Sequence, residues 1–308
     1  MVKSSRIATV RAPNPSAMTL QGTNSYLIDG GNGEGICIDP GPAIESHIRA
    51  LASAAEGSKF RIRAILLTHG HPDHAPAAAA LRERTAASVY AHHRSAVPHD
   101  LELDDGEGVQ VGDRSIRALD APGHTFDHLV FFEERERALF TGDVIVGEGT
   151  VVIAPPGGAM RPYQATLERL ARTFDNASII YGGHGPPVTD PAAKIREYIE
   201  HRRQRERELL DALSAGPRTI PELVARIYAQ TQPLLWPAGA RQILAYLIAL
   251  ENESRVRSTP VNRPMTTQEE AILDPDWASI TGEGDAELAS AELGASSCEP
   301  IRRYALIR

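Results

Sequence analysis

The sequence predicts an α/β protein in which strands and helices form layers, followed by a C-terminal winged helix. Short apolar runs such as 62–67 and 178–181 end in polar loops, and helical segments separate them, as in a layered α/β fold. Beyond residue 190, three helical patterns precede two short strand-like runs, which is the order of a winged helix. We therefore expect a first domain over 1–192 and a second over 193–308.

Composition limits the class of protein. The chain has 308 residues, 42% of them hydrophobic, which is enough for one large domain or for a large and a small one. Cys37 and Cys298 lie outside any CxxC motif, which argues against a thiolate metal site. Two cysteines are too few for a disulfide framework, so we expect a reducing compartment, the cytoplasm. Residues 1–10 hold no long apolar run, so we expect no signal peptide. No stretch approaches the roughly 20 apolar residues of a membrane helix, so we expect no membrane partner.

The first predicted elements lead to a polar loop. Residues 23–39 have the pattern of a hairpin, in which glycines supply the positive φ that a tight turn needs. The apolar run 62–67 is typical of a strand and ends in 68–74, which is rich in polar groups. Pro76 then suits the first turn of a helix that continues to about Arg84.

Strands and helices alternate up to residue 190. The predicted strands are 88–92, one or two within 109–119, a hairpin of 129–132 and 138–140, and 178–181. Residues 163–174 have helical periodicity through Leu167, Leu170 and Phe174. The ends of these strands again coincide with polar loops that contain glycine.

The C-terminal region has the pattern of three helices and two strands. The predicted elements are helices 191–213, 221–229 and 237–251 and strands 255–257 and 303–307. Thr219 can cap the second helix, and Glu222 follows three residues later, as a capping box requires.

An acidic segment separates the two C-terminal strands. Residues 258–299 contain nine acidic residues and one basic residue, Arg263, so this segment alone carries a net charge of −8. The whole chain also has a net charge of −8, so the remainder is neutral by this count. Such charge bias usually marks a solvated or disordered stretch. We expect an acidic insertion near 259–299 within the wing.

The strongest functional signal is the segment Thr68-His69-Gly70-His71-Pro72-Asp73-His74. It places three imidazoles and a carboxylate within six residues, on a loop that follows a strand. Such a loop can direct several side chains to a common point, and imidazole with carboxylate suits Zn²⁺, Fe²⁺ or Mn²⁺. A merely solvated polar loop is a poor explanation for such dense ligand-type residues. The segment therefore predicts a metal site.

Three later residues fit the same chemistry. His124, Asp143 and His184 each follow or end an apolar run, and each stands beside a glycine that lets backbone approach an ion closely. Taken singly, each has the sequence context of an ordinary loop residue. Their order and spacing after the first motif favour a role as metal ligands.

The HxHxDH motif followed by His, Asp and His resembles the metallo-β-lactamase superfamily over roughly residues 10–190. The resemblance implies an αββα sandwich with the metal ions at one edge, and all seven ligand positions are filled. By this resemblance, His69, His71 and His124 hold a first ion, Asp73, His74 and His184 hold a second, and Asp143 bridges both. We expect two Zn²⁺ ions per chain, with Fe²⁺ or Mn²⁺ as alternatives.

The resemblance also implies a reaction. Two ions roughly 3.5–4 Å apart can share a hydroxide whose pKa falls to about 7 on metal binding, and this hydroxide attacks a carbonyl or phosphoryl group. Asp73 lies between two ligand histidines, so it is also the candidate catalytic residue, with the role of orienting the nucleophile. A filled Asp143 position is similar to the glyoxalase II, lactonase and nuclease branches. The superfamily name therefore says little about the substrate.

A second resemblance narrows the branch. Residues 185–188, the helix through Tyr198, His201 and Arg205, the winged helix, and residues 19–24 resemble the β-lactamase-like protein 2 branch. Its members include a mitochondrial endoribonuclease for single-stranded RNA and thioesterase-like enzymes of polyketide pathways. The long acidic insertion departs from that branch.

Two functions follow as alternatives. The first is hydrolysis of a small carbonyl substrate, namely a thioester, an ester or a lactone; the second is endonucleolytic cleavage of single-stranded RNA gripped by the winged helix. RNA binding needs clustered basic residues. The long helix supplies Arg202, Arg203, Arg205 and Arg207, but Glu206 and Glu208 dilute them. We favour a small-molecule substrate over RNA, with the winged helix as a wall of the active site or a dimer element in a homo-oligomer.

A non-enzymatic module is disfavoured, because binding alone does not require seven metal ligands. Weaker candidates remain around the motif. Asp39 is expected either to support the ligands or simply to form a turn, and His128 to be an ordinary packed or surface residue rather than to contact substrate. His92 and His93 are expected at the surface or behind the ligands. Arg161 and Tyr163 mark a helix start at the surface, with a substrate groove as the alternative.

Overall fold

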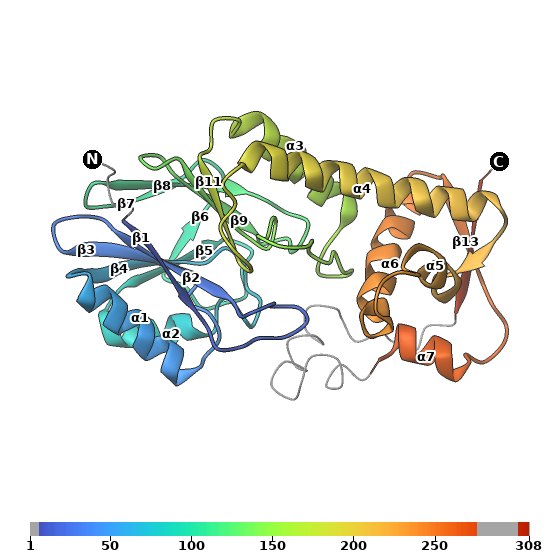
Figure 1. Cartoon of the computed structure of the whole chain (residues 1–308), viewed down its shortest axis with the longest axis horizontal. Coiled ribbons are helices and arrows are strands. Elements are labelled where there is room, and N and C mark those ends of the chain that lie inside the picture. Colours follow the sequence, from blue (N-terminus) through green and yellow to red (C-terminus); the bar gives the residue numbers. More distant parts are fainter. Residues whose placement is uncertain (1–5, 276–300, 308) are drawn as a thin grey trace.

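The computed structural model describes residues 6–275 and 301–307. Two β-sheets pack face to face with helices on their outer sides, and a smaller C-terminal part lies beside this sandwich (Figure 1). The αββα architecture and the C-terminal winged helix that the sequence predicts are confirmed. Within the described part of the chain, no helix is long and apolar enough to span a membrane.

The first sheet has the strand order β1-β2-β3-β4-β5-β6. Its strands are β1 (Ile7–Arg11), β2 (Asn24–Asp29), β3 (Glu34–Ile38), β4 (Arg61–Leu66), β5 (Ser88–His92) and β6 (Leu101–Leu103). Helices α1 (Glu45–Gly57) and α2 (Ala77–Thr85) cover its outer face, where Leu27 and Ile65 cluster with Leu51 and Leu81. The hairpin predicted over 23–39 is β2–β3, and the strand predicted over 62–67 is β4.

The second sheet has the order β11-β10-β9-β8-β7. Its strands are β7 (Gly108–Val111), β8 (Arg114–Asp120), β9 (Leu129–Glu133), β10 (Ala138–Gly142) and β11 (Ile179–Gly182), and helix α3 (Met160–Thr173) packs on its outer face. Because side chains alternate along a strand, the inner faces of both sheets form a second core. In that core the Tyr26 and Phe140 rings lie 5.2 Å apart.

The C-terminal part is a winged helix attached through one long helix. Its elements are α4 (Pro191–Ser214), β12 (Arg218–Thr219), α5 (Ile220–Ile227), the 3₁₀ turn η1 (Pro233–Leu235), α6 (Trp236–Asn252), β13 (Val256–Pro260), α7 (Thr267–Leu273) and β14 (Arg302–Leu306). Strands β12, β14 and β13 form a small sheet. The predicted capping box is present, with Thr219 and Glu222 each bonded to the other's backbone N–H. In Figure 1, α4 runs from the sandwich across to the winged helix.

The acidic insertion lies between β13 and β14, as the sequence predicts, and its residues 276–300 fall outside the described residues. The expectation of a merely solvated or disordered stretch is wrong for its first part, which forms α7. A second capping box, made by Thr266 and Glu269, starts this helix, and Glu269 also pairs with Arg263 at 2.7 Å. Ile272 is buried against the winged helix.

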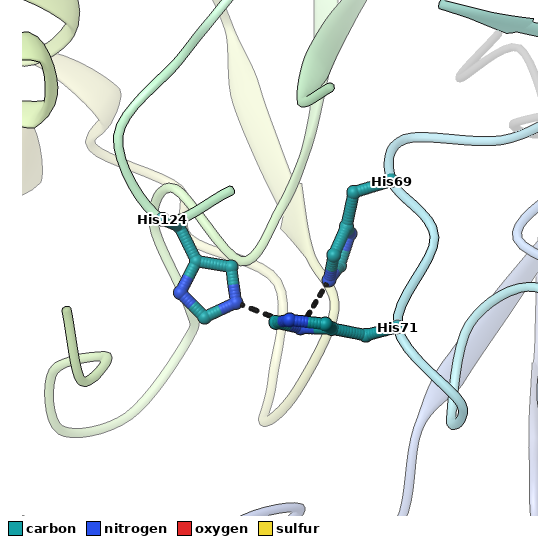
Figure 2. Close-up of side chains that lie close together, drawn as sticks. All are labelled: His69, His71 and His124. Atoms are coloured by element: carbon teal, nitrogen blue, oxygen red, sulfur yellow. Dashed lines mark hydrogen bonds between the residues drawn. The ribbon is translucent and has the colours of Figure 1, made fainter. Parts of the chain in front are cut away.

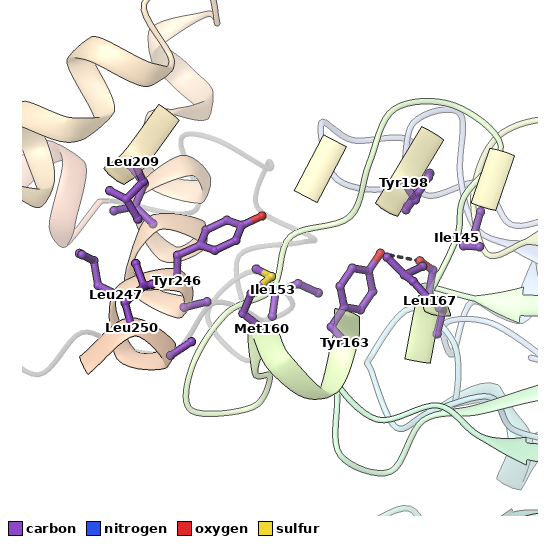
Figure 3. Packing of buried hydrophobic residues seen from close by; sticks show 14 of the residues in the cluster. Ile145, Ile153, Met160, Tyr163, Leu167, Tyr198, Leu209, Tyr246, Leu247 and Leu250 are labelled. Carbon is purple, nitrogen blue, oxygen red and sulfur yellow. Dashed lines mark hydrogen bonds between the residues drawn. The ribbon is translucent and has the colours of Figure 1, made fainter. Parts of the chain in front are cut away.

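One hydrophobic core joins the sandwich to the winged helix (Figure 3). Ile153 and Met160, from the segment before and at the start of α3, belong to the same cluster as Leu209 of α4 and Tyr246 and Leu250 of α6. Because this core is continuous, the loops of the sandwich and helix α6 hold each other in place. The expected domain boundary at residues 192–193 falls at the start of α4 and stays a prediction.

Candidate metal centre

The candidate ligands come from loops that follow strands of both sheets. The loop after β4 carries His69, His71, Asp73 and His74; the β8–β9 loop carries His124; Asp143 follows β10 and His184 follows β11. Close approach at this point requires glycine. At Gly183, a Cβ atom would stand only 2.3 Å from Asp143 Oδ1 and 2.6 Å from His74 Cε1. All seven residues are therefore brought to one small region.

Three of these histidines form the first group (Figure 2). His69 Nε2 lies 2.9 Å from His71 Nδ1, and His124 Nε2 lies 3.1 Å from the same atom. Burial and the neighbouring imidazoles lower the pKa of His71 to about 3 and also lower the pKa values of His69 and His124. These imidazoles are neutral near pH 7, and a neutral imidazole has the lone pair that a metal ligand needs.

The second group contains both buried carboxylates. His184 Nε2 lies 3.3 Å from Asp73 Oδ2 and 3.3 Å from Asp143 Oδ2. His74 Nε2 lies 3.2 Å from Asp73 Oδ2 and 3.5 Å from Asp143 Oδ1. Asp143 also reaches the first group, because its Oδ2 lies 3.8 Å from His124 Nε2. This placement between the two groups is what a bridging ligand requires.

The unpartnered atoms of this region fit metal binding. Asp73 Oδ1 and Asp143 Oδ1 are buried and accept no hydrogen bond from any residue of the described chain. Buried charges normally need pairing or a metal ion. Burial by itself lowers the pKa of His184, but the charges of Asp143 and Asp73 outweigh it and raise that pKa to about 10. In the metal-free chain a proton on His184 therefore compensates the carboxylates, a task that a cation can take over.

Hydrogen bonds behind the candidate ligands orient their rings. Asp39 Oδ2 lies 2.9 Å from His74 Nδ1 and 2.7 Å from Thr68 Oγ1, while Asp39 Oδ1 accepts from Thr68 N at 2.7 Å. His124 Nδ1 lies 3.0 Å from the carbonyl oxygen of Val152. Such contacts select the tautomer that leaves the other ring nitrogen free. Asp39 thus supports a candidate ligand, one of its two expected roles.

The weaker candidates fall behind or away from the ligands. His128 is buried, stacks on the His69 ring at 4.6 Å, and its Nε2 accepts from Asp143 N at 3.2 Å, so it is packed, as expected. His92 is buried and His93 is exposed, with its Nδ1 2.5 Å from Asp104 Oδ1.

Arg161 and Tyr163 are not among the residues that line the cavity at the candidate metal centre. Arg161 pairs with Glu206 and Glu253, and the buried Tyr163 hydroxyl donates to the Val144 carbonyl at 2.7 Å.

One contact of a candidate ligand could not be foreseen from the sequence. The Thr23 hydroxyl, within the segment 19–24 that carries the branch resemblance, donates to Asp73.

A cavity of about 370 Å³ opens at the candidate metal centre and continues toward the winged helix. Its metal end is formed by His124, Asp143 and His184. Its other walls come from residues 17–20, the segment 146–154, helices α4 and α6, and the connection between α5 and α6 that carries Tyr228, Thr231 and Leu235. The winged helix therefore completes the wall of the cavity, in agreement with the interpretation of it as a wall of the active site.

Four arginines of α4 are engaged in contacts within the protein. Arg203 pairs with Glu168, Arg205 with Glu208 and Arg207 with Glu200, whereas Arg202 is buried; these are the four arginines that could have gripped RNA. Helix α6 of the winged helix has one basic residue, Arg241, and most of its residues are buried. Neither helix offers the clustered, exposed charge that phosphate binding needs.

Comparison with known proteins agrees with this geometry. A family model described as the metallo-beta-lactamase superfamily matches residues 18–184, and one described as the beta-lactamase associated winged helix domain matches residues 219–261. Lactamase-like protein adaB of Aspergillus niger is 36% identical over 235 residues, 70% of either chain. A beta-lactamase-like protein 2 homologue of Drosophila melanogaster is 32% identical over 271 residues, 82% of this chain and 90% of that one.

Other similar proteins include an enzyme and a solved structure. An atrochrysone carboxyl ACP thioesterase of Aspergillus fumigatus is 34% identical over 217 residues, 69% of this chain and 66% of that one. The crystal structure of a metallo-beta-lactamase family protein from Thermus thermophilus superposes with a TM-score of 0.69 at 24% identity, over 82% of this chain and 96% of that one. This last likeness concerns the fold.

Proposed function

The chain belongs to the metallo-β-lactamase superfamily of hydrolases, and we propose that it cleaves a small carbonyl substrate, with a thioester as the first choice and an ester or lactone next. The single observation that supports this most is the cavity that runs from the candidate ligands to the winged helix. A cavity of about 370 Å³ suits a small molecule, and ligand sites of this size are typically concave and partly apolar. Thioesterases among the relatives point to the same class of substrate.

The proposed metal centre is dinuclear. His69, His71 and His124 would hold one ion, Asp73, His74 and His184 the other, and Asp143 would bridge them. The distances of 3.8 Å from Asp143 Oδ2 to His124 Nε2 and 3.3 Å to His184 Nε2 support this assignment. Zn²⁺ is the metal we propose, with Fe²⁺ or Mn²⁺ compatible with the same imidazole and carboxylate ligands. Bound at such ligands, divalent ions supply Lewis acidity and lower the pKa of a coordinated water.

The chain itself positions and protects the reacting groups. Asp73 is held through Thr23 and by its neighbours His74 and His184, so its carboxylate has a defined orientation in which to position the attacking water. Residues 17–20 and 146–154 enclose the reaction space, which excludes bulk water and strengthens electrostatic interactions inside it. Because the attacking group is water, no serine or cysteine nucleophile is needed. Ser25 contacts His47 at 2.9 Å in the interior, and Cys37 is buried within a core.

The endoribonuclease alternative has weaker support. Of the four α4 arginines considered for RNA binding, Arg202 is buried and Arg203, Arg205 and Arg207 are paired with acidic residues, and α6 carries one basic residue. The winged helix contributes to the cavity and to the shared core instead. We keep RNA in the test as the competing outcome.

The decisive experiment is turnover by the metal-loaded full chain of a panel that contains acyl thioesters, esters, lactones, β-lactams and single-stranded RNA. We expect the highest kcat/KM for a thioester and no cleavage of RNA. Replacing Asp143 with Asn in the same assay shows whether turnover depends on the proposed centre. Preferential cleavage of RNA, or turnover that the Asp143→Asn variant retains in full, would overturn the proposal.

A further inference from the structure

Arg202 of α4 is a buried cation whose hydrogen-bond partners are neutral. Its Nη1 donates to Gln242 Oε1 at 3.0 Å, its Nη2 donates to the Val151 carbonyl at 2.8 Å, and its guanidinium lies 5.1 Å from the centre of the Tyr163 ring. Within residues 6–275 and 301–307, no carboxylate forms an ion pair with it. Because burying a charge is costly, buried charges are normally paired. Arg202 therefore lacks a counter-charge of its own.

Two hydrogen-bond donors at this position are also without partners. Arg202 Nε and Gln242 Nε2 are buried, and neither donates to any group of the described chain. The amide orientation of Gln242 is determined by two donors that need its oxygen, Arg202 Nη1 and the Ile153 backbone N–H at 3.2 Å. Nε2 is therefore the remaining donor. A buried guanidinium and a free amide N–H together favour an anionic oxygen.

This wall belongs to the cavity that starts at the candidate metal centre. Arg202 and Gln242 border the same cavity as Asp143 and His184, and so do His201 and Arg205 from the same stretch of α4. Arg205 is partly compensated by Glu208 and lies over the Tyr228 ring at 5.0 Å. Two acidic residues border the cavity: Asp143 at the metal centre and the exposed Glu148. The wall that Arg202 and Arg205 contribute is thus cationic.

We propose that Arg202 and Gln242 form a subsite for an anionic oxygen group, a carboxylate or a phosphate, on the substrate and remote from its scissile carbonyl. The inference rests on the proposed function, which places that carbonyl at the metal end of the cavity. The cavity also has apolar lining residues that suit a hydrocarbon part of such a substrate: Val146, Val151, Val152 and Ala154. An anion beside Arg202 compensates the buried guanidinium where the dielectric is low and the attraction is strong.

The anion can come from either half of the substrate, and the two sources are separable. One pair of thioesters compares a butyryl with a glutaryl group on the same neutral thiol. A second pair compares butyryl-pantetheine with butyryl-4′-phosphopantetheine. A preference for the charged member in the first pair assigns the subsite to the acyl end, and in the second pair to the thiol end; either result supports the proposal.

The sharpest variant is Gln242→Glu. It keeps an acceptor for Arg202 Nη1 and for Ile153 N, so the fold should persist, but it removes the free donor and supplies the missing counter-charge. We expect the ratio of kcat/KM for the charged over the neutral substrate to fall at least about 10-fold, through KM, because a charge-assisted contact is lost. We also expect a higher melting temperature, because the buried charge becomes paired.

Gln164→Glu is the matched control. Gln164 Oε1 also accepts from an arginine, Arg161 Nη1 at 2.6 Å, but on α3 outside the cavity. This variant should leave the substrate ratio unchanged. Equal losses for charged and neutral substrates in Gln242→Glu, or no change in either, would show that Arg202 and Gln242 only support the fold.

A binding measurement separates failure of the subsite from failure of the proposed function. If the wild-type chain hydrolyses no thioester, ester or lactone, the proposed function is wrong, and calorimetry with glutarate and with inorganic phosphate then tests the subsite alone. The full chain is treated with chelator first, so that neither anion binds at the metal centre. Binding that Gln242→Glu abolishes supports the subsite. Absence of binding to the wild type, or equal binding to both proteins, overturns it.

Discussion

The Thr23 hydroxyl donates a 2.7 Å hydrogen bond to Asp73 Oδ2 across 50 residues of sequence, and both residues are buried. Thr23 stands just before β2 and forms an isolated β-bridge with His184, so it touches two candidate ligands of the second group. Asn14 Nδ2 in turn donates to Thr23 Oγ1 at 3.0 Å, which directs the threonine proton toward the carboxylate. The residues before β2 therefore set the orientation of Asp73.

Thr23→Val removes this hydrogen bond while keeping the shape of the side chain. Contacts behind metal ligands are typically worth about 10–100-fold in metal affinity or activity, so we expect a loss in that range. Affinity for the more weakly held ion, measured by competition with a chelator, is the direct readout. Thr23→Ser, which keeps the hydroxyl, should recover most of it. Equal affinities in the wild type and the valine variant would show that the contact does not position Asp73.

Metal content tests the proposed ligand set. Seven ligand-type side chains around two foci should hold two ions per chain, and elemental analysis of carefully reconstituted protein should approach that ratio. Asp143→Asn weakens the shared position, so we expect hydrolysis to fall by about 10³-fold or more, with far-UV circular dichroism unchanged. A reconstituted wild-type sample with a single ion per chain would contradict the dinuclear centre.

The elements with strong local signals could be predicted from the sequence. The capping box at Thr219, the apolar run of β4 and the long polar helix α4 all carry their own start, end or periodicity. Other elements were not predicted, among them α1 and β1. Helix α1 begins after Ile44 without a side-chain cap, and β1 is stabilised mainly by pairing with β2. Such elements depend on tertiary contacts that a local pattern does not contain.

The candidate site also has a part that the sequence predicts and a part that it does not. The candidate ligands could be listed because four stand in one short segment and the others follow strands. The supporting contacts could not be listed, since Thr23 meets Asp73 and Gln242 meets Arg202 only after the chain has folded. The cavity likewise depends on how α4 and α6 pack against the segment 146–154, which no spacing along the chain reveals.

Protonation of His47 in α1 should account for part of the stability that the fold loses at acid pH. Burial lowers its pKa from 6.5 to about 4, with a small opposing effect of the Pro40 backbone. The unfolded chain therefore binds a proton below pH 6.5 that the folded chain accepts only near pH 4. Stability that is fully present above pH 6.5 should be lost as the pH falls from 6.5 to 4, by on the order of 2–3 kcal/mol from this residue.

The measurement is urea unfolding of the wild type and of His47→Gln at pH 7.5, 6.0 and 4.5. At pH 7.5 both side chains are uncharged, so the difference there reports the structural cost of the substitution alone. The two free energies of unfolding should converge toward pH 4.5, because the glutamine cannot take up a proton. Parallel curves would mean that His47 does not titrate between the folded and unfolded states as described.

Glu206 connects three parts of the structure, and replacing it tests how much these ion pairs contribute to stability. Its carboxylate pairs with Arg161 of α3 and, at 2.9 Å, with Arg255 just before β13, while the side chain stays largely buried on α4. Burial alone would raise the pKa of Glu206. The two arginines outweigh this effect and hold the pKa below its usual value. This contribution is therefore complete above the usual glutamate pKa and is lost as the pH falls through the lowered value.

We expect Glu206→Gln to destabilise the protein at pH 7 by about 1–2 kcal/mol, since one largely buried acid serves two arginines in a network. Thermal unfolding at pH 7 and pH 3.5 is the measurement, and the difference from the wild type should shrink at the lower pH. Glu200→Gln on the same helix is the control, because its pair with Arg207 is exposed at 2.5 Å and such surface pairs contribute little. Equal effects of the two substitutions would show that the Glu206 network adds nothing beyond an ordinary surface ion pair.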